Sequence, residues 1–299
     1  MKNDSINNQE LYYRKTKTII ENEIISSCLL LKDFRLLCVS SNYLKVYDLN
    51  NDYNCDIVIE KLPHEINNFD KTIQLSTGKL VTICSGRKML IWKIFKNSYD
   101  LELILKKAHP GIMVNLIEIT SNRIVSSSTE SSIRIWKIPH FIRITTIRTK
   151  TFISNMMQPK GIDKLICMSI NQFVSIINLS TYQIELKIKD QITSFIVINY
   201  QIIIATKEYL CFYELNTTEF TKSREPFPFN IKKILSFSKI SNHKILFGSK
   251  DGYLGIYDLK TDKFNHLVHI SRYPINFIQS INDKRYIINI EQGVAFYEY

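Results

Sequence analysis

The sequence predicts an all-β protein made of seven similar antiparallel sheets of four strands each, arranged in a closed ring. Three observations predict this arrangement: a strand that recurs along the chain, little helical periodicity between the copies, and a last copy that lacks its fourth strand. At 299 residues the chain is long for one compact core. A core that grows by stacking repeats is therefore the simpler solution.

The first observation is a strand whose end carries an aromatic or aliphatic anchor. Seven strands end in VYDL, IWKI, IWKI, IINL, FYEL, IYDL and FYEY, and their anchors are Tyr47, Trp92, Trp136, Ile177, Tyr213, Tyr257 and Tyr297. Successive anchors are 45, 44, 41, 36, 44 and 40 residues apart. A period of about 40 to 45 residues is typical of the four-stranded blade of a β-propeller.

The second observation is the alternation inside each unit. The third unit contains the segments MVNLIEI, RIVSSS, SIRIWKI and FIRITTI, separated by short polar turns. Alternation with a period of two residues predicts strands rather than helices. Each unit is therefore expected to supply four short strands.

The third observation concerns closure of the ring. The last unit stops at Tyr299, directly after its third strand, and a blade of three strands would leave an open edge. Residues 11–20, LYYRKTKTII, alternate as an outer strand should. We expect them to complete the seventh blade, with residues 1–10 as a polar tail and residues 11–299 as a single seven-bladed propeller.

The best-preserved copy carries a resemblance. Gly248-Ser249, Asp251-Gly252 and Ile256-Tyr257-Asp258 match, in order and spacing, the Gly-Ser, Asp-Gly and Ile-Trp-Asp segments of the WD-repeat family of β-propellers. The chain resembles that family over residues 11–299. The resemblance implies a rigid, non-catalytic scaffold or adaptor that holds partner proteins within a larger complex.

The resemblance also implies a buried tetrad of histidine, serine or threonine, aspartate and tryptophan in each blade. The third unit supplies a nearly whole set, with glutamate in place of aspartate, and the other units supply parts of it. The residues assigned a structural role on this basis are His109, Ser126, Glu130 and Trp136 in the third unit, His64, Thr82 and Trp92 in the second, Asp251 and Tyr257 in the sixth, and His269 in the seventh.

Motifs of catalysis and cofactor binding are missing from the sequence. It contains no nucleophile elbow, phosphate-binding loop, dinucleotide fingerprint or zinc-protease motif. We therefore expect no enzyme, no cofactor and no metal site. An enzyme would need a deep central pocket with titratable groups, and a pocket lined only by apolar and hydroxyl side chains would exclude that class.

Other polar and sulfur-containing residues are expected to have ordinary roles. The six cysteines are scattered without metal-ligand spacing, so we expect reduced, buried thiols. Glu21 and Glu23 are expected to be solvated charges at a strand edge.

No run of about 18 apolar residues occurs, and the first residues are too polar for a signal peptide. We therefore expect an intracellular, cytoplasmic protein without a transmembrane segment.

The charge distribution suggests a binding surface. The formal net charge is +11, and residues 87–164 hold 14 Lys and Arg against 5 Asp and Glu. Six cations of this sector are expected on one rim, namely Arg87, Lys88, Lys106, Lys107, Arg148 and Lys150. They form either a solvated surface or a docking patch for an acidic protein segment. The alternative function is a polyanion-binding module, for RNA or an anionic membrane surface, on blades 2 to 4.

Overall fold

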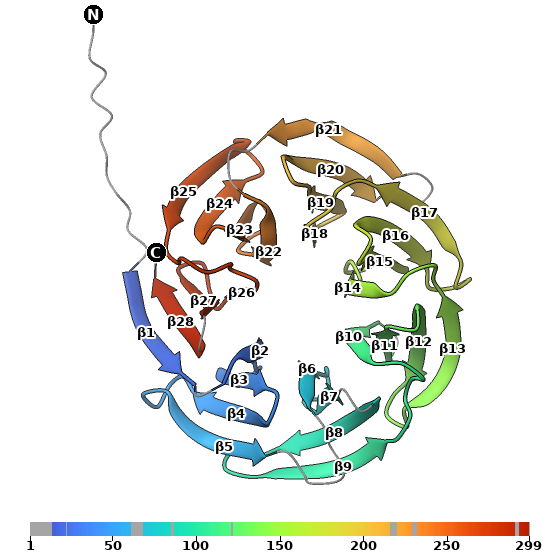
Figure 1. Ribbon diagram of the computed structural model, residues 1–299, viewed down its shortest axis with the longest axis vertical. Coiled ribbons are helices and arrows are strands. Elements are labelled where there is room, and N and C mark those ends of the chain that lie inside the picture. Colours follow the sequence, from blue (N-terminus) through green and yellow to red (C-terminus); the bar gives the residue numbers. More distant parts are fainter. Residues whose placement is uncertain are drawn as a thin grey trace, which may run out of the picture.

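The computed structural model shows seven blades arranged in a ring around a central axis (Figure 1). It describes residues 14–21, 23–60, 68–84, 87–120, 122–215, 220–228, 232–290 and 293–298. These residues form 28 strands in seven four-stranded antiparallel sheets, and none of them is helical. The prediction of an all-β, seven-bladed propeller is confirmed.

Within each of blades 1 to 6 the strands follow the sequence from the centre of the ring outwards. Blade 1 holds β2 (Ile25–Leu30), β3 (Arg35–Ser40), β4 (Tyr43–Asp48) and β5 (Asn54–Glu60). Blade 2 holds β6 (Phe69–Gln74), β7 (Leu80–Cys84), β8 (Lys88–Ile94) and β9 (Tyr99–Leu105). Blade 3 holds β10 (Met113–Ile119), β11 (Arg123–Ser128), β12 (Ser132–Lys137) and β13 (Ile142–Arg148).

The next three blades repeat this order. Blade 4 holds β14 (Ile153–Met157), β15 (Lys164–Ser169), β16 (Phe173–Asn178) and β17 (Ile184–Lys189). Blade 5 holds β18 (Ser194–Ile198), β19 (Gln201–Ala205), β20 (Tyr209–Leu215) and β21 (Phe220–Pro228). Blade 6 holds β22 (Ile234–Lys239), β23 (Lys244–Ser249), β24 (Tyr253–Asp258) and β25 (Lys263–His269).

Blade 7 is built from both ends of the chain. It consists of β26 (Ile278–Ser280), β27 (Arg285–Ile290), β28 (Gly293–Glu298) and, as its outer strand, β1 (Arg14–Ile20). The β1 strand pairs antiparallel with β28, from Arg14 opposite Glu298 to Ile20 opposite Gly293. The predicted closure is confirmed, although the described strand begins at Arg14 and residues 1–13 lie outside the described part.

The hydrophobic core lies in the gaps between neighbouring sheets. Trp92, which is completely buried, packs in a cluster that combines residues of blades 1 and 2. Trp136 packs in the next cluster, which combines blades 2 and 3. Because each sheet contributes one face to each neighbouring gap, a single sheet could not bury its apolar residues alone. This division of the core explains why the apolar pattern recurs from blade to blade.

Similar hydrogen bonds join blade 1 to blade 2, blade 2 to blade 3 and blade 3 to blade 4. A side chain at the end of an inner strand, or one residue before or after that end, accepts a backbone N–H of the preceding blade over distances of 2.6 to 2.9 Å. The acceptors and donors are Gln74 with Lys32, Glu118 with Ser76, and Gln158 with Thr120. These bonds satisfy loop N–H groups that the sheets leave unpaired.

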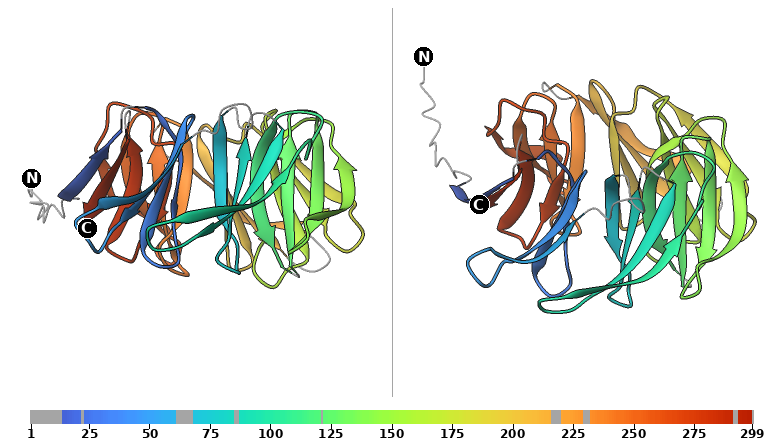
Figure 2. Two further views of the ribbon diagram at one scale, coloured as in Figure 1. Left: turned by 90° about the horizontal axis from the view of Figure 1, so that it is seen from below. Right: turned by 60° about the horizontal axis from the view of Figure 1, so that its bottom comes forward.

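The loops fall on two faces of the ring, which Figure 2 shows edge-on. Because the strands are antiparallel, the loop between the second and third strands lies at the same end as the loop that leads into the blade. We call this the top face. Backbone hydrogen bonds tie such loops together, from Ala108 N to Arg87 O at 2.9 Å and from Thr149 N to Ser131 O at 2.8 Å.

Candidate functional site: the central channel and the top face

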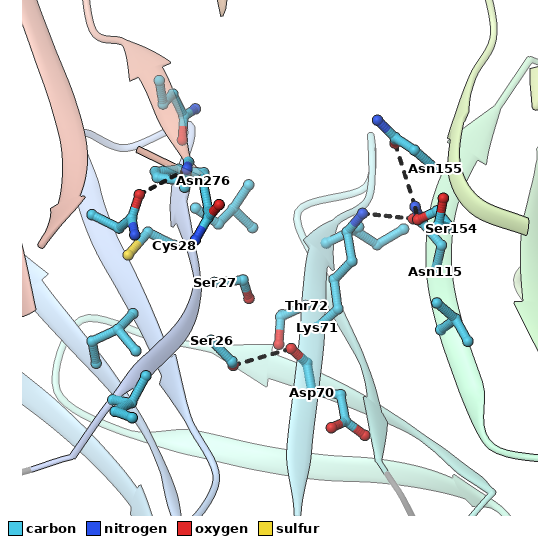
Figure 3. A pocket seen from close by; sticks show the side chains of 18 of the residues that line it. Ser26, Ser27, Cys28, Asp70, Lys71, Thr72, Asn115, Ser154, Asn155 and Asn276 are labelled. Atoms are coloured by element: carbon cyan, nitrogen blue, oxygen red, sulfur yellow. Dashed lines mark hydrogen bonds between the residues drawn. The ribbon is translucent and has the colours of Figure 1, made fainter. Parts of the chain in front are cut away.

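The central channel contains a cavity of about 780 Å³ (Figure 3). Its walls come from the inner strands β2, β6, β10 and β14 and from blade 7, while Ile24, Tyr273 and Pro274 lie towards the top face. Most of the residues labelled in Figure 3 are serine or asparagine, and Gln279 also lines the cavity. A cavity of this size accommodates a small organic molecule.

A β-bulge places two consecutive titratable residues on the cavity wall. The register between β6 and β7 shifts between Phe69 and Lys71, so both Asp70 and Lys71 line the cavity. Burial raises the pKa of Asp70 to about 6 and lowers the pKa of Lys71 to about 8. The cavity therefore contains titratable groups and is not of the apolar-and-hydroxyl kind that excludes an enzyme.

Asp70 and Lys71 do not neutralise each other. Figure 3 shows their side chains pointing in opposite directions. Lys71 Nζ donates to Asn115 Oδ1 at 2.6 Å, whereas Asp70 Oδ2 has no hydrogen-bond partner among the residues that the structure describes. Neither residue forms an ion pair within the part of the chain that the structure describes. Lys71 thus presents a positive charge in a confined polar space.

Four side-chain amides of the wall are oriented by the backbone. Their oxygens accept backbone N–H groups: Asn115 from Leu116 at 2.7 Å, Asn155 from Met156 at 2.9 Å, Gln279 from Leu30 at 3.0 Å and Asn289 from Phe277 at 2.7 Å. A backbone N–H can only donate, so the oxygen must face it and the NH₂ group is left for other partners.

These NH₂ groups make the wall rich in donors. Asn115 Nδ2 donates to Ser154 O at 2.8 Å, which holds that amide between blades 3 and 4. Within the described residues, the NH₂ groups of Asn155, Gln279 and Asn289 have no hydrogen-bond acceptor. The cavity therefore offers an ammonium group and several unused N–H donors to a ligand.

Sequence reasoning missed these channel residues, although a signal was present. Lys71 and Asn115 lie 44 residues apart, and Asn115 and Asn155 lie 40 apart, which places them at corresponding positions of three successive repeats. The anchors drew attention to the third strand of each unit. Aligning the first strands on the same period would have revealed a polar position facing the channel.

The tetrad residues of the third unit lie together in the structure. His109 is fully buried, with Nε2 2.7 Å from Ser126 Oγ and Nδ1 3.0 Å from Glu130 Oε1. Trp136 Nε1 donates to Ser126 Oγ at 2.8 Å. A carboxylate accepts only, so the imidazole proton resides on Nδ1, and Nε2 accepts from Ser126. The chain of donors and acceptors is complete, as burial requires.

Burial keeps this imidazole neutral. It lowers the pKa of His109 to about 4, although the hydrogen bond to Glu130 acts in the opposite direction. Ser132 Oγ also donates to Glu130 Oε1 at 2.7 Å. The cluster therefore fixes the loop that enters blade 3 to the strands β11 and β12.

In the second unit, Thr82 and Trp92 do not form the hydrogen bond that the resemblance implies. Thr82 Oγ1 lies 2.9 Å from Thr72 Oγ1 on the neighbouring strand, and Trp92 Nε1 has no hydrogen-bond partner among the described residues. The threonine hydroxyl is satisfied by Thr72, so Trp92 contributes apolar contacts alone. His64 lies outside the described residues.

The remaining residues of the predicted set serve local turns and surfaces. Asp251 accepts from Ser249 Oγ at 2.5 Å and from Lys232 N at 3.3 Å, and the buried Tyr257 donates its hydroxyl to Asp262. His269 is exposed and its ring lies edge-on to that of Tyr253. None of these contacts builds a second complete tetrad within the described chain.

The six predicted cations lie on loops or strand ends of the top face. Arg87 donates to Pro110 O at 2.6 Å, which brings its turn against the loop that contains Lys106 and Lys107. Lys88 begins β8, Arg148 ends β13 opposite Ser132, and Lys150 follows in the loop to blade 4. Five of the six side chains are exposed, and Lys88 is half-buried.

Two exposed aliphatic residues lie among these loops and escaped the sequence reasoning. Ile112 is 49% exposed and Ile170 is 52% exposed. Backbone bonds from Thr129 N to Ile112 O and from Ile170 N to Phe152 O place both on the top face. A single isoleucine in a polar loop has no periodic pattern, so only the fold identifies it as a surface residue.

Two expectations about individual residues are wrong. Glu21 is 2% exposed rather than solvated, because it follows β1 into the gap beside blade 1, where it accepts hydrogen bonds from Tyr43, Lys45 and Tyr47. Cys55 is exposed, whereas the other five cysteines are buried, and the six form no disulfide bond.

Comparison with protein-family models gave no match for the chain, and comparison with curated proteins gave none either. No helix capable of crossing a membrane occurs in the described segments. The same segments contain no group of three or more His, Cys, Asp or Glu side chains that could hold a metal ion.

Proposed function

We propose that the protein is a non-catalytic adaptor, a divergent member of the WD-repeat propellers, whose top face docks an acidic segment of a partner protein. The observation that carries the proposal is the hydrogen bond from Arg87 to Pro110, which brings the cations of two loops side by side at the rim of blades 2 and 3. A closed ring with short loops loses little conformational entropy when a partner docks.

The surroundings of these cations favour a protein segment over a polyanion. Ile112 and Ile170 offer apolar contacts that an acidic peptide with aliphatic residues can use. Binding of single-stranded nucleic acid commonly relies on exposed aromatic platforms. In the described loops of blades 2 to 4 on the top face, no aromatic side chain is exposed.

The test compares three defined probes on the full chain: a fluorescent acidic peptide containing leucine and isoleucine, a single-stranded RNA, and vesicles with anionic lipid. The peptide should bind, and Lys107→Glu combined with Arg148→Glu should weaken it by about tenfold or more. Lys160→Glu combined with Lys284→Glu changes the same charge on the opposite face, where both side chains are exposed, and should leave binding unchanged.

The salt dependence separates the two functions. Preferential binding of RNA or vesicles, lost steeply between about 50 and 200 mM salt, would replace the adaptor by a polyanion-binding module. Equal loss in both charge-reversed pairs would show that net charge, rather than the top face, attracts the peptide.

A further inference from the structure

The walls of the central channel have a surplus of hydrogen-bond donors. Asn155, Gln279 and Asn289 turn their amide oxygens to the backbone and keep NH₂ groups without an acceptor among the described residues. Lys71 adds an ammonium group of which one hydrogen bond, to Asn115, is satisfied within the protein. These amide side chains are half-buried, so their NH₂ groups are open to a ligand that supplies oxygen atoms.

The cavity wall holds one residue of each charge, Asp70 and Lys71, and the ammonium group of Lys71 is the one that lies beside the amides, within hydrogen-bond distance of Asn115. Lys71 has no ion-pair partner among the described residues, and Asp70 directs its carboxyl group away from it. A confined ammonium group without a counter-ion binds an anion more strongly than an exposed one does. The unpartnered donors and the isolated charge are independent observations that point to one kind of ligand.

The placement of the donors distinguishes between classes of anion. Lys71 belongs to blade 2, Asn155 to blade 4, and Gln279 and Asn289 to blade 7, around a cavity of about 780 Å³. A phosphate group presents its oxygens from a single phosphorus atom and suits a compact cluster of donors. Donors spread over several blades match a ligand whose oxygens are themselves spread out.

From this arrangement we propose that the central channel binds a small organic anion with two or more carboxylate groups. Lys71 holds one carboxylate, and the amides of blades 4 and 7 donate to the others. The ligand enters from the top face, past Ile24 and Tyr273. This site is independent of the adaptor proposal, because none of its residues belongs to the basic rim.

Isothermal titration of the full chain with citrate and with inorganic phosphate tests the proposal, at pH 7 and constant ionic strength. Citrate should bind more tightly than phosphate, and Lys71→Met should weaken it by about tenfold or more, since a charge-assisted hydrogen bond is lost. Asn155→Asp, which replaces a donor by an acceptor of the same shape, should also weaken it. Lys107→Met, on the basic rim, is the matched control and should leave affinity unchanged.

A second measurement does not depend on the folding of any variant. Reductive methylation of the wild-type chain, read by mass spectrometry, should modify Lys71 more slowly with citrate than without, while Lys107 is modified equally in both. Absence of citrate binding, binding of phosphate alone, unchanged affinity of Lys71→Met, or equal losses in Lys71→Met and Lys107→Met would each overturn the proposal.

Discussion

Lys45 Nζ lies 2.6 Å from Glu21 Oε2, and this ion pair joins the strand that closes the ring to the first blade. The Glu21 side chain is 1% exposed and that of Lys45 is 24% exposed. The hydroxyls of Tyr43 and Tyr47 donate to the same carboxylate. Burial, followed by the bond to Glu21, raises the pKa of both tyrosines well above their usual value. The closure thus depends on a buried charge with several donors.

Replacing Glu21 should therefore loosen the closure. Glu21→Ala leaves the Lys45 ammonium and two tyrosine hydroxyls without their acceptor, and removing one partner of a buried pair costs about 3 kcal/mol or more. The free energy of unfolding, measured by chemical denaturation, provides the check. Glu102→Ala, which breaks the more exposed ion pair between Lys79 and Glu102, should cost no more than about 1 kcal/mol.

Removing the closing strand should have a larger effect than removing one contact. Deletion of residues 1–20 takes away β1 and exposes the β28 edge along its whole length. We expect the thermal midpoint to fall sharply and the variant to aggregate. Deletion of residues 1–10 alone should change the midpoint little, and an equal fall in both variants would contradict the assignment of those ten residues as a tail.

The two tryptophans should respond differently to the same substitution. Trp136 donates to Ser126, whereas Trp92 Nε1 has no hydrogen-bond partner in the described part of the chain. Both Trp→Phe changes remove a similar volume from the core. Trp136→Phe additionally removes a buried hydrogen bond and should cost about 1 kcal/mol more in unfolding free energy. A greater loss for Trp92→Phe would show that its indole N–H has an acceptor after all.

Acid should destabilise the tetrad of blade 3. The pKa of His109 is lowered to about 4, while an unfolded histidine titrates near 6.5, so between these values the unfolded chain binds more protons. The contribution of His109 to stability is present above about pH 6.5 and is lost as the pH falls towards 4. The free energy of unfolding of wild type and His109→Gln, measured across this range, should converge.

Ionisation of Asp70 changes the stability of the fold in the opposite direction, over an overlapping pH range. Its pKa is raised to about 6, so its contribution to stability is present at low pH and is lost as the pH rises from about 4 to 6. Asp70 is present in both wild type and His109→Gln, so its contribution cancels in the difference between their free energies of unfolding. A difference that does not change with pH would contradict the neutral, buried imidazole.

The parts of the fold that sequence reasoning predicted are those with a strong periodic signal. The anchors and the alternation in the third unit follow from apolar residues that must enter a gap between two sheets. The closing strand was predicted at residues 11–20 from the open edge of a three-stranded last blade, and the described strand is Arg14–Ile20. The resemblance to the WD-repeat pattern, measured back from the anchor, selected His109, Ser126, Glu130 and Trp136, and these side chains lie within hydrogen-bond distance of one another in a chain.

What could not be predicted depends on contacts between repeats. Glu21 looked like a solvated edge charge because its three donors come from a strand more than twenty residues away. Thr82 matched the spacing of the tetrad, yet a neighbouring threonine satisfies it. The donor surplus of the channel became visible only when each amide oxygen could be assigned to its backbone partner.

The pairing of β1 with β28 also means that the first strand must wait for the last one during synthesis. Thr16 and Phe296, which are joined by a hydrogen bond, lie 280 residues apart. At the usual rates of translation, on the order of tens of seconds pass between the emergence of the two strands from the ribosome. Throughout that interval β1 is a strand without its neighbour, and its basic residues Arg14, Lys15 and Lys17 discourage association with strands of other nascent chains.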